Sequence, residues 1–214
     1  LVLGYGGRFA IGCALLEAGA EHVILCEYKV KPDHSYNKTL LPQYESFLKL
    51  KNDRVEVNKH QLTLVEGDIR EVARQKRFDL VDIVLSNSVY EHLADVEGIT
   101  QALAMVAKPD SVALHFVDLR DHFFKYPFEM LQFSAKIWYR WLNPTSHHNR
   151  LRLWDYRKAF TQVYAEVEIT ILGSDIKAYQ DIEPFIQPEF KQGSLEENAV
   201  THIRVFTRRP LNRE

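Results

Sequence analysis

Short apolar runs alternate with segments of helical period along the first two-thirds of the chain. Apolar side chains at positions 96, 99, 103 and 106 mark one face of a helix, and Asp95 stands directly before them as an N-cap. Residues 80–85 are almost continuously Leu, Val and Ile, as expected for a parallel strand covered on both faces. The pattern predicts strands at residues 1–3, 23–26, 62–65, 80–85 and 112–117, helices at residues 8–18, 40–48 and 96–106, and a loop at residues 32–37.

Strands that alternate with helices predict a doubly wound α/β fold with a mostly parallel sheet. The last third of the chain has a different pattern. Residues 153–164 predict a helix, whereas residues 167–172 and 201–207 alternate as strands and predict an antiparallel hairpin at the sheet edge. A long acidic loop would join these two strands. One further apolar stripe predicts a single helix that ends at Asn143-Pro144, and its members are Phe128, Leu131, Ala135, Trp138 and Leu142.

Composition narrows the classes of function. The 214 residues include 27 Lys and Arg against 29 Asp and Glu, and this balance argues against a nucleic-acid-binding protein. No apolar stretch is long enough to span a bilayer, and no signal peptide is visible. Cys13 and Cys26 lie in apolar runs, so we expect buried, reduced thiols and a soluble, cytoplasmic protein. Because residues 1–3 already form a predicted strand, we also expect that upstream residues are missing from this sequence.

A glycine-rich turn, Gly4-Tyr5-Gly6-Gly7, joins the first predicted strand to the first predicted helix. Ligands of doubly wound sheets bind beyond the carboxyl ends of the strands, and glycine lets the backbone approach a ligand closely. Glu27 ends the second strand, where a carboxylate can accept hydrogen bonds from ribose hydroxyls. Asp68 ends the third strand, where it can accept from an exocyclic amine. Taken singly, these features could be a tight turn, a surface acid and a helix N-cap, but together they predict a nucleoside-binding site.

A nicotinamide-binding fingerprint would place glycine or alanine two residues after Gly7, where this chain has Phe9. Another set of motifs fits better: Leu3-Gly4-Tyr5-Gly6-Gly7 with Glu27, Val65-Glu66-Gly67-Asp68-Ile69, the segment 78–92 that ends in Tyr90-Glu91-His92, and Val106-Ala107-Lys108-Pro109-Asp110-Ser111. With these motifs, in this order and spacing, residues 1–124 resemble the class I S-adenosylmethionine-dependent methyltransferases. The segments 117–123 and 149–156 resemble a bacterial branch of that family with small-molecule or glycan-type members.

The resemblance implies a seven-stranded Rossmann-like sheet and S-adenosylmethionine as cofactor. It implies that Gly4 and Gly6 line the methionine moiety, Glu27 holds the ribose, Asp68 with Ile69 flanks the adenine, Ser86 with Asn87 lies near the reacting methyl, and Tyr5, Gly7 and Tyr28 complete the cofactor site. The chain departs from the family at Val2, where an acid is usual, and at Pro109-Asp110-Ser111, where Pro-Gly-Gly is usual. The implied division is a cofactor-binding core at 1–124, a helical cap on the acceptor side at 125–164, and an edge hairpin of the same domain at 165–214.

Methyl transfer from a sulfonium requires alignment, and a hydroxyl or amine nucleophile must also lose a proton. His92 follows the fourth predicted strand, and Asp118 with His122 follows the fifth. An Asp–His pair can act as a general base with an orienting partner. The alternatives are a structural histidine at position 92 and helix capping by Asp118 or Asp121, and no residue spacing supports a metal site.

Two further segments carry polar groups. Arg150 or Arg152 could bind an acidic acceptor, or could form a salt bridge to the acidic stretch 166–197. His147-His148 is expected to lie in an exposed loop. The aromatic stripe that includes Trp138 is expected to be mostly core, although its surplus aromatics could roof an acceptor pocket or form a homodimer face.

The sequence therefore predicts an enzyme that moves a methyl group from S-adenosylmethionine to an oxygen or nitrogen of a small molecule or sugar. Two alternatives stay open. One is an NAD(P)-dependent oxidoreductase, which Phe9 disfavours, and the other is a non-catalytic, methyltransferase-like binding subunit, which Val2 keeps open. We expect neither a nucleic-acid nor a membrane partner.

Overall fold

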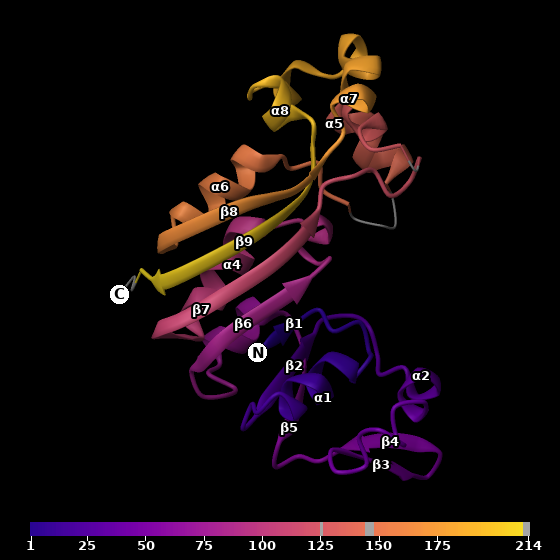
Figure 1. The fold of residues 1–214 in the computed structure, drawn as a ribbon, viewed down its shortest axis with the longest axis vertical. Coiled ribbons are helices and arrows are strands. Elements are labelled where there is room, and N and C mark those ends of the chain that lie inside the picture. Colours follow the sequence, from indigo (N-terminus) through magenta and orange to yellow (C-terminus); the bar gives the residue numbers. More distant parts are fainter. Residues whose placement is uncertain (125, 144–147, 212–214) are drawn as a thin grey trace.

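The central element of the fold is a seven-stranded sheet (Figure 1). The computed structural model describes residues 1–124, 126–143 and 148–211. The strand order is β5-β2-β1-β6-β7-β9-β8, and β9 runs antiparallel to both of its neighbours while the other pairs are parallel. This confirms the predicted doubly wound sheet with a C-terminal antiparallel pair. The strands are β1 (Val2–Leu3), β2 (Val23–Glu27), β5 (Leu62–Glu66), β6 (Val81–Asn87), β7 (Ala107–Asp118), β8 (Tyr164–Ser174) and β9 (Val200–Pro210).

Helices on the two faces of the sheet enclose two apolar clusters. On one face, Cys13 and Leu16 of α1 pack with Val2 and Leu25 of the sheet. On the other face, three helices supply the larger cluster, and Figure 1 shows α4 and α6 behind the strands β6 to β8. The first face carries α1 (Ala10–Glu17), and the three helices of the second face are α3 (Ile69–Arg74), α4 (Val96–Met105) and α6 (Leu153–Thr161).

Two local predictions are confirmed in this core. The Asp95 side chain caps α4 by accepting a hydrogen bond from the Gly98 N–H at 2.8 Å. Both cysteines are free and buried, and burial raises the pKa of Cys13 to about 11 and that of Cys26 to about 12. Within the part of the chain that the structure describes, no helix is long and apolar enough to cross a membrane.

The segment between β2 and β5 differs from its prediction. The expected loop at residues 32–37 contains the short helix α2 (His34–Lys38), and the expected helix at residues 40–48 is replaced by turns that lead into a hairpin of β3 (Leu48–Lys51) and β4 (Arg54–Val57). The helical spacing of the apolar residues corresponds to two single turns and not to a continuous helix. In these turns Tyr44 N–H donates to Leu40 O, and Leu48 N–H donates to Tyr44 O. Asn52 and Asp53 then take positive φ angles and turn the chain back as a hairpin.

The apolar stripe in the last third forms three short helices instead of the predicted single one: η2 (Glu129–Gln132), α5 (Ala135–Ile137) and the π-helical η3 (Trp138–Leu142). The break occurs because Phe133 is extended and Ser134 starts a new helix, with its hydroxyl accepting from the Ile137 N–H at 3.4 Å. η3 ends at Leu142, and Pro144 lies outside the described residues.

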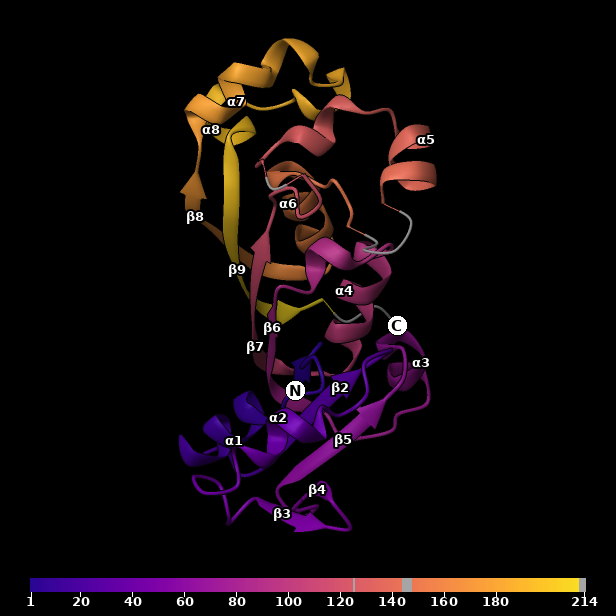
Figure 2. The ribbon, with the colours of Figure 1, turned by 90° about the vertical axis from the view of Figure 1, so that its right-hand side faces the viewer.

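The predicted acidic loop between β8 and β9 also contains helices: α7 (Ile176–Ile182), η4 (Glu183–Phe185), η5 (Pro188–Phe190) and α8 (Leu195–Asn198). Phe128, Leu131 and Trp138 share a third apolar cluster with Tyr179 and Phe190. Two insertions that are distant in sequence therefore form one cap, which Figure 2 shows above the sheet. We call residues 126–142 and 175–199 the cap.

Candidate functional site

The glycine turn follows β1 and has a distinct role at each position. Gly4, Gly6 and Gly7 all have positive φ angles, of 71°, 62° and 76°. A Cβ on Gly7 would lie 2.3 Å from Lys31 O, and one on Gly4 would lie 2.4 Å from Val89 Cγ2, so both glycines are required by protein packing. A Cβ on Gly6 would meet nothing within 4 Å. Gly6 is therefore the glycine whose backbone is open to a ligand.

Glu27 is hydrogen-bonded to this turn. Its Oε2 accepts from Gly6 N–H at 3.1 Å, and its Oε1 accepts from Tyr28 N–H at 2.9 Å. The carboxylate is thus held beside the open glycine with lone pairs to spare. The Tyr28 side chain is 59% exposed, whereas Tyr5 is half-buried, and burial together with the Glu27 charge raises the pKa of Tyr5 to about 12.

Asp68 acts as the N-cap of α3, which was the structural alternative to its role at the adenine. Its Oδ1 accepts from Arg70 N–H at 2.9 Å, and the Arg70 guanidinium contacts both carboxylate oxygens and also Asp95. The hydrogen bonds from Arg70 hold the pKa of Asp68 below its usual value. The neighbouring Ile69 is 2% exposed and packs in the larger apolar cluster, so its side chain is not open to a ligand in this structure.

The end of β6 carries one buried and one exposed polar side chain. The Ser86 hydroxyl is buried and lies 2.8 Å from His115 Nδ1. Burial lowers the pKa of His115 to about 3, so this imidazole is neutral at physiological pH. Asn87 is exposed. Of these two predicted cofactor residues, Asn87 is the one whose side chain is available at the sheet edge.

His92 lies on the short helix η1 (Tyr90–His92), and Asn149 holds this turn in place. The Asn149 side-chain amide donates to Tyr90 O at 2.7 Å and to Leu93 O at 3.0 Å, and its backbone N–H donates to Glu91 O at 2.7 Å. Asn149 is itself buried. Its role could not be derived from the sequence, because the two segments are 59 residues apart at the Tyr90 contact.

Asp118 and His122 form the pair that their positions predicted. His122 Nε2 lies 3.3 Å from Asp118 Oδ2, Arg120 binds both oxygens of the same carboxylate, and His202 Nε2 on β9 lies 3.5 Å from Asp118 Oδ1. Burial alone would raise the pKa of Asp118, but the hydrogen bonds from His122 and Arg120 hold it far below its usual value. The hydrogen bond to Asp118 raises the pKa of His122.

The rings of His92 and His148 lie beside that of His122, and we call these three imidazoles the histidine cluster. The ring centroids of His92, His122 and His148 lie 4.6 to 5.6 Å from one another. The expectation of an exposed His148 was wrong: it is 2% exposed, because Trp138 and Asn143 bind its backbone carbonyl. Burial lowers the pKa of His148 to about 4. His147 lies outside the described residues.

His202 also belongs to this group, and no motif in the sequence pointed to it. Asp121 precedes bends and no helix begins there, so the helix-capping alternative does not hold for it. It is buried and its Oδ1 accepts from the N–H groups of Phe123 and Phe124 at 2.7 and 3.0 Å.

Arg150 and Arg152 do not form the salt bridge to the acidic stretch that was one of their two expected roles. Both are buried, and neither forms a salt bridge with a described carboxylate. Arg150 donates to the carbonyls of Met130 and Phe133 in the cap. Arg152 donates to the carbonyls of Leu119, Asn198 and Val200 at 3.0, 3.0 and 2.6 Å. Arg152 thus joins the cap and β9 to the end of β7, and Arg150 joins the segment before α6 to the cap, so both guanidiniums have structural roles.

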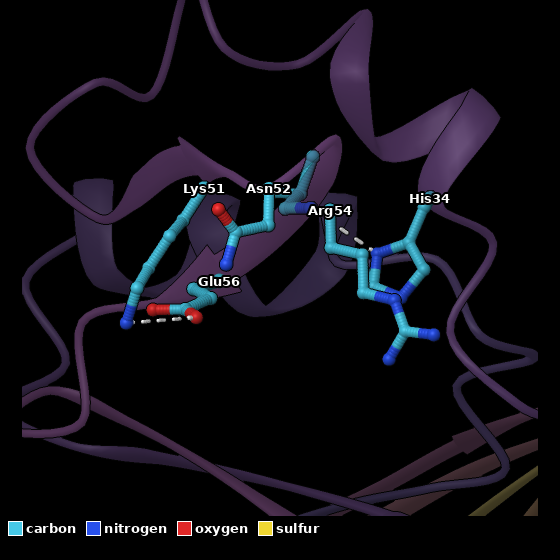
Figure 3. A pocket seen from close by; sticks show the side chains of 6 residues that line it. His34, Lys51, Asn52, Arg54 and Glu56 are labelled. Atoms are coloured by element: carbon cyan, nitrogen blue, oxygen red, sulfur yellow. Dashed lines mark hydrogen bonds and ion pairs between the residues drawn. The ribbon is translucent and has the colours of Figure 1, made fainter.

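No group of His, Cys, Asp or Glu among the described residues has the geometry to hold a metal ion. A pocket of about 440 Å³ lies between α2 and the β3–β4 hairpin (Figure 3). It is lined by His34, Arg54 and the Lys51–Glu56 ion pair, and it contains none of the predicted site residues.

No protein-family model matches the chain, and no curated protein matches it. Solved structures do. A geranyl diphosphate C-methyltransferase from Streptomyces coelicolor, crystallised with S-adenosyl-L-homocysteine, superposes with a TM-score of 0.55 at 10% identity over 97% of this chain and 68% of its own. A chain from the complex between the Haloferax volcanii Trm112 methyltransferase activator and a methyltransferase superposes with a TM-score of 0.52 at 17% identity, over 98% and 81%.

Phosphoethanolamine N-methyltransferase 2 from Haemonchus contortus, in complex with S-adenosyl-L-methionine, superposes with a TM-score of 0.54 at 10% identity over 98% of this chain. This chain spans about half of that one, with 48% of it covered. The neighbours differ in substrate and share their architecture, which agrees with the strand order reported above. The chain therefore has the Rossmann-like fold of the class I S-adenosylmethionine-dependent methyltransferases.

Proposed function

We propose that this protein transfers a methyl group from S-adenosylmethionine to an oxygen or nitrogen of a small molecule or sugar. The observation that carries the proposal is a direct contact between the two halves of the site. Val89 packs against Gly4 of the glycine turn, and its carbonyl accepts from the His92 N–H at 2.9 Å. The turn that bears His92 thus sits on the glycine turn, so the Gly6–Glu27 unit and the histidine cluster share one end of the sheet. The buried free thiols are compatible with a cytoplasmic enzyme.

The residues present fit the proposed cofactor. Gly6 leaves open space beside its backbone, and the Glu27 carboxylate next to it suits the two hydroxyls of a ribose. When bound, S-adenosylmethionine supplies a methyl group already activated on a sulfonium, so the protein has mainly to align the acceptor. Val2 cannot replace the usual acid, because its side chain is buried in the smaller apolar cluster. The methionine end would therefore depend on backbone groups of the turn.

The histidine cluster would handle the acceptor's proton. His122 accepts the proton of the hydroxyl or amine as the new bond to the methyl carbon forms, and Asp118 orients the imidazole. The raised pKa of His122 means that the neutral, proton-accepting form increases as the pH rises through that pKa. Methyl transfer should consequently be faster on the alkaline side of this titration.

Calorimetric titration with S-adenosylmethionine and with NADH tests the cofactor. We expect binding of S-adenosylmethionine, and we expect Glu27→Ala to weaken it by about 1–3 kcal/mol through a lost charge-assisted hydrogen bond. Glu66→Ala is the matched control, since Glu66 pairs in register with Glu27 on the next strand but its carboxylate is bonded to the Lys31 side chain and not to the glycine turn. Its affinity should stay within about twofold of wild type.

Binding of NADH alone would favour the oxidoreductase alternative. An unchanged affinity in Glu27→Ala would remove the ribose assignment. If the cofactor binds and a broad panel of hydroxyl and amine acceptors stays unmethylated, the non-catalytic binding subunit becomes the better description.

A further inference from the structure

The pocket of about 440 Å³ between α2 and the β3–β4 hairpin has no role in the mechanism above (Figure 3). Its volume is within the range of small-molecule binding sites. Its lining consists almost entirely of polar side chains: His34, Lys51, Asn52, Arg54 and Glu56, with Val55 as the single apolar member. Such a lining favours a polar ligand, and the charges of the pocket indicate which kind.

The walls of the pocket are held in place by backbone pairing and by apolar packing. β3 and β4 form a regular antiparallel hairpin. Val55 is 3% exposed and packs in the smaller apolar cluster, which anchors the hairpin to the α1 side of the core. From α2, His34 Nδ1 accepts a hydrogen bond from the Val55 N–H at 3.2 Å and joins the two walls. The pocket is therefore formed before a ligand binds.

One end of the pocket carries two hydrogen-bond donors. A backbone N–H can only donate, so His34 Nδ1 carries no proton and the proton of the neutral ring lies on Nε2. No described residue accepts from this Nε2–H. The Arg54 guanidinium likewise has no hydrogen bond or ion pair with a described residue. Figure 3 shows these two side chains together, so their donors are available to the same ligand.

The carboxylates near the pocket are already compensated by lysines. Lys51 Nζ lies 3.6 Å from Glu56 Oε1, and Lys49 Nζ lies 3.9 Å from Glu56 Oε2. Asp53, in the turn of the hairpin, is bound by Lys38, whose hydrogen bond lowers the pKa of that carboxyl. Neither carboxylate pairs with the guanidinium at the other end, which is therefore the uncompensated charge of the pocket.

We propose that this pocket binds the phosphate group of a small anionic ligand, with the Arg54 guanidinium and the His34 Nε2–H as its donors. The two oxygens of a carboxylate are used up by the guanidinium fork, whereas a phosphate has three terminal oxygens and can accept from the imidazole as well. A cation would find no free carboxylate here, and an apolar ligand would find only one buried valine. The net charge of −2 on the chain argues against a nucleic acid as the source of the phosphate.

NMR titration of the full chain at constant ionic strength tests the pocket. The probes are inorganic phosphate, ribose 5-phosphate and neutral ribose, and the reporters are the Val55 amide and the His34 imidazole. We expect both phosphates to shift these resonances saturably and ribose to leave them unchanged. Arg54→Gln should weaken phosphate binding roughly tenfold or more, because the charge-assisted fork is lost. Arg74→Gln is the matched control, since this exposed arginine pairs with Glu71 on α3, outside the pocket. Its affinity should stay within about twofold of wild type.

The relative affinities identify the source of the phosphate. Equal or tighter binding of ribose 5-phosphate assigns the site to a phosphorylated small molecule, and tighter binding of inorganic phosphate assigns it to the free ion, so either result supports the proposal. The absence of a saturable shift with both phosphates overturns it, as does an equal shift with neutral ribose or an Arg54→Gln variant that binds as wild type does. The titration uses neither S-adenosylmethionine nor an acceptor, so a failure of the proposed methyl transfer would leave its result unchanged.

Discussion

Replacement of Arg152 by methionine is expected to lower the free energy of unfolding by about 3 kcal/mol. The Arg152 side chain is fully buried, and burial lowers its pKa to about 10, so it remains a cation at neutral pH. Its three acceptors are the backbone carbonyls of Leu119, Asn198 and Val200. Methionine fills a similar volume but leaves all three carbonyls unpaired, and the loss of the buried charge recovers only part of that cost.

Denaturation in urea at pH 7 measures this effect. Arg157→Met, on the same helix, is the matched control, since the Arg157 side chain is 52% exposed and donates to the Glu197 carboxylate at 3.3 Å. That variant should stay within about 0.5 kcal/mol of wild type. Equal stabilities of the Arg152 and Arg157 variants would show that water can replace the guanidinium at these carbonyls.

Substitution of the neighbouring glycines by alanine should separate the packing role of the turn from its ligand-binding role. Gly7→Ala is expected to cost about 3 kcal/mol or more, because a positive φ and a backbone clash act together. The added Cβ would lie 2.3 Å from Lys31 O, and the turn could yield only by disrupting the bonds from Asp33 N–H and Asn37 Nδ2 to Gly7 O, each 2.9 Å.

Gly6→Ala has the same unfavourable φ but no clash, so its cost in stability should be about 1 kcal/mol. The larger effect should be on ligand binding. The affinity for S-adenosylmethionine should fall roughly tenfold or more, because the alanine Cβ occupies the open space beside the backbone. Urea denaturation and calorimetry on both variants provide the two readouts. If Gly6→Ala bound the cofactor as well as wild type does, the open glycine would not face the ligand.

The candidate site was predictable to different extents in its two halves. Glu27 and the glycine turn meet because both follow neighbouring parallel strands, and the strand pattern alone places such ends at one edge. The Asp118–His122 pair could equally be predicted from the sequence, since its members are four residues apart. The place of His148 could not be predicted, because its burial depends on Trp138 and Asn143. The positions of those two residues follow in turn from the breaks in the cap helices.

Arg150 and Arg152 illustrate the same limit for charged residues. A basic, aromatic segment suggested ligand binding or salt bridges, and local sequence carries no information about distant backbone carbonyls. Only the closure of the cap over the end of β7 brings Leu119 and Asn198 to the same guanidinium. The turns that replace the helix expected at residues 40–48 have a related cause, because Tyr44 packs in one apolar cluster with Val55 of the hairpin that follows.

By itself, the sequence determined the doubly wound sheet, the glycine turn with its acidic strand ends, and the antiparallel pair at the edge. These features follow from periodicities and turn residues that act over a few positions. Only the tertiary structure decided which glycine is open to a ligand, which arginines are structural and which histidine is buried. These properties depend on contacts between segments tens of residues apart, where burial and the supply of hydrogen-bond partners, not local propensity, set the state of each side chain.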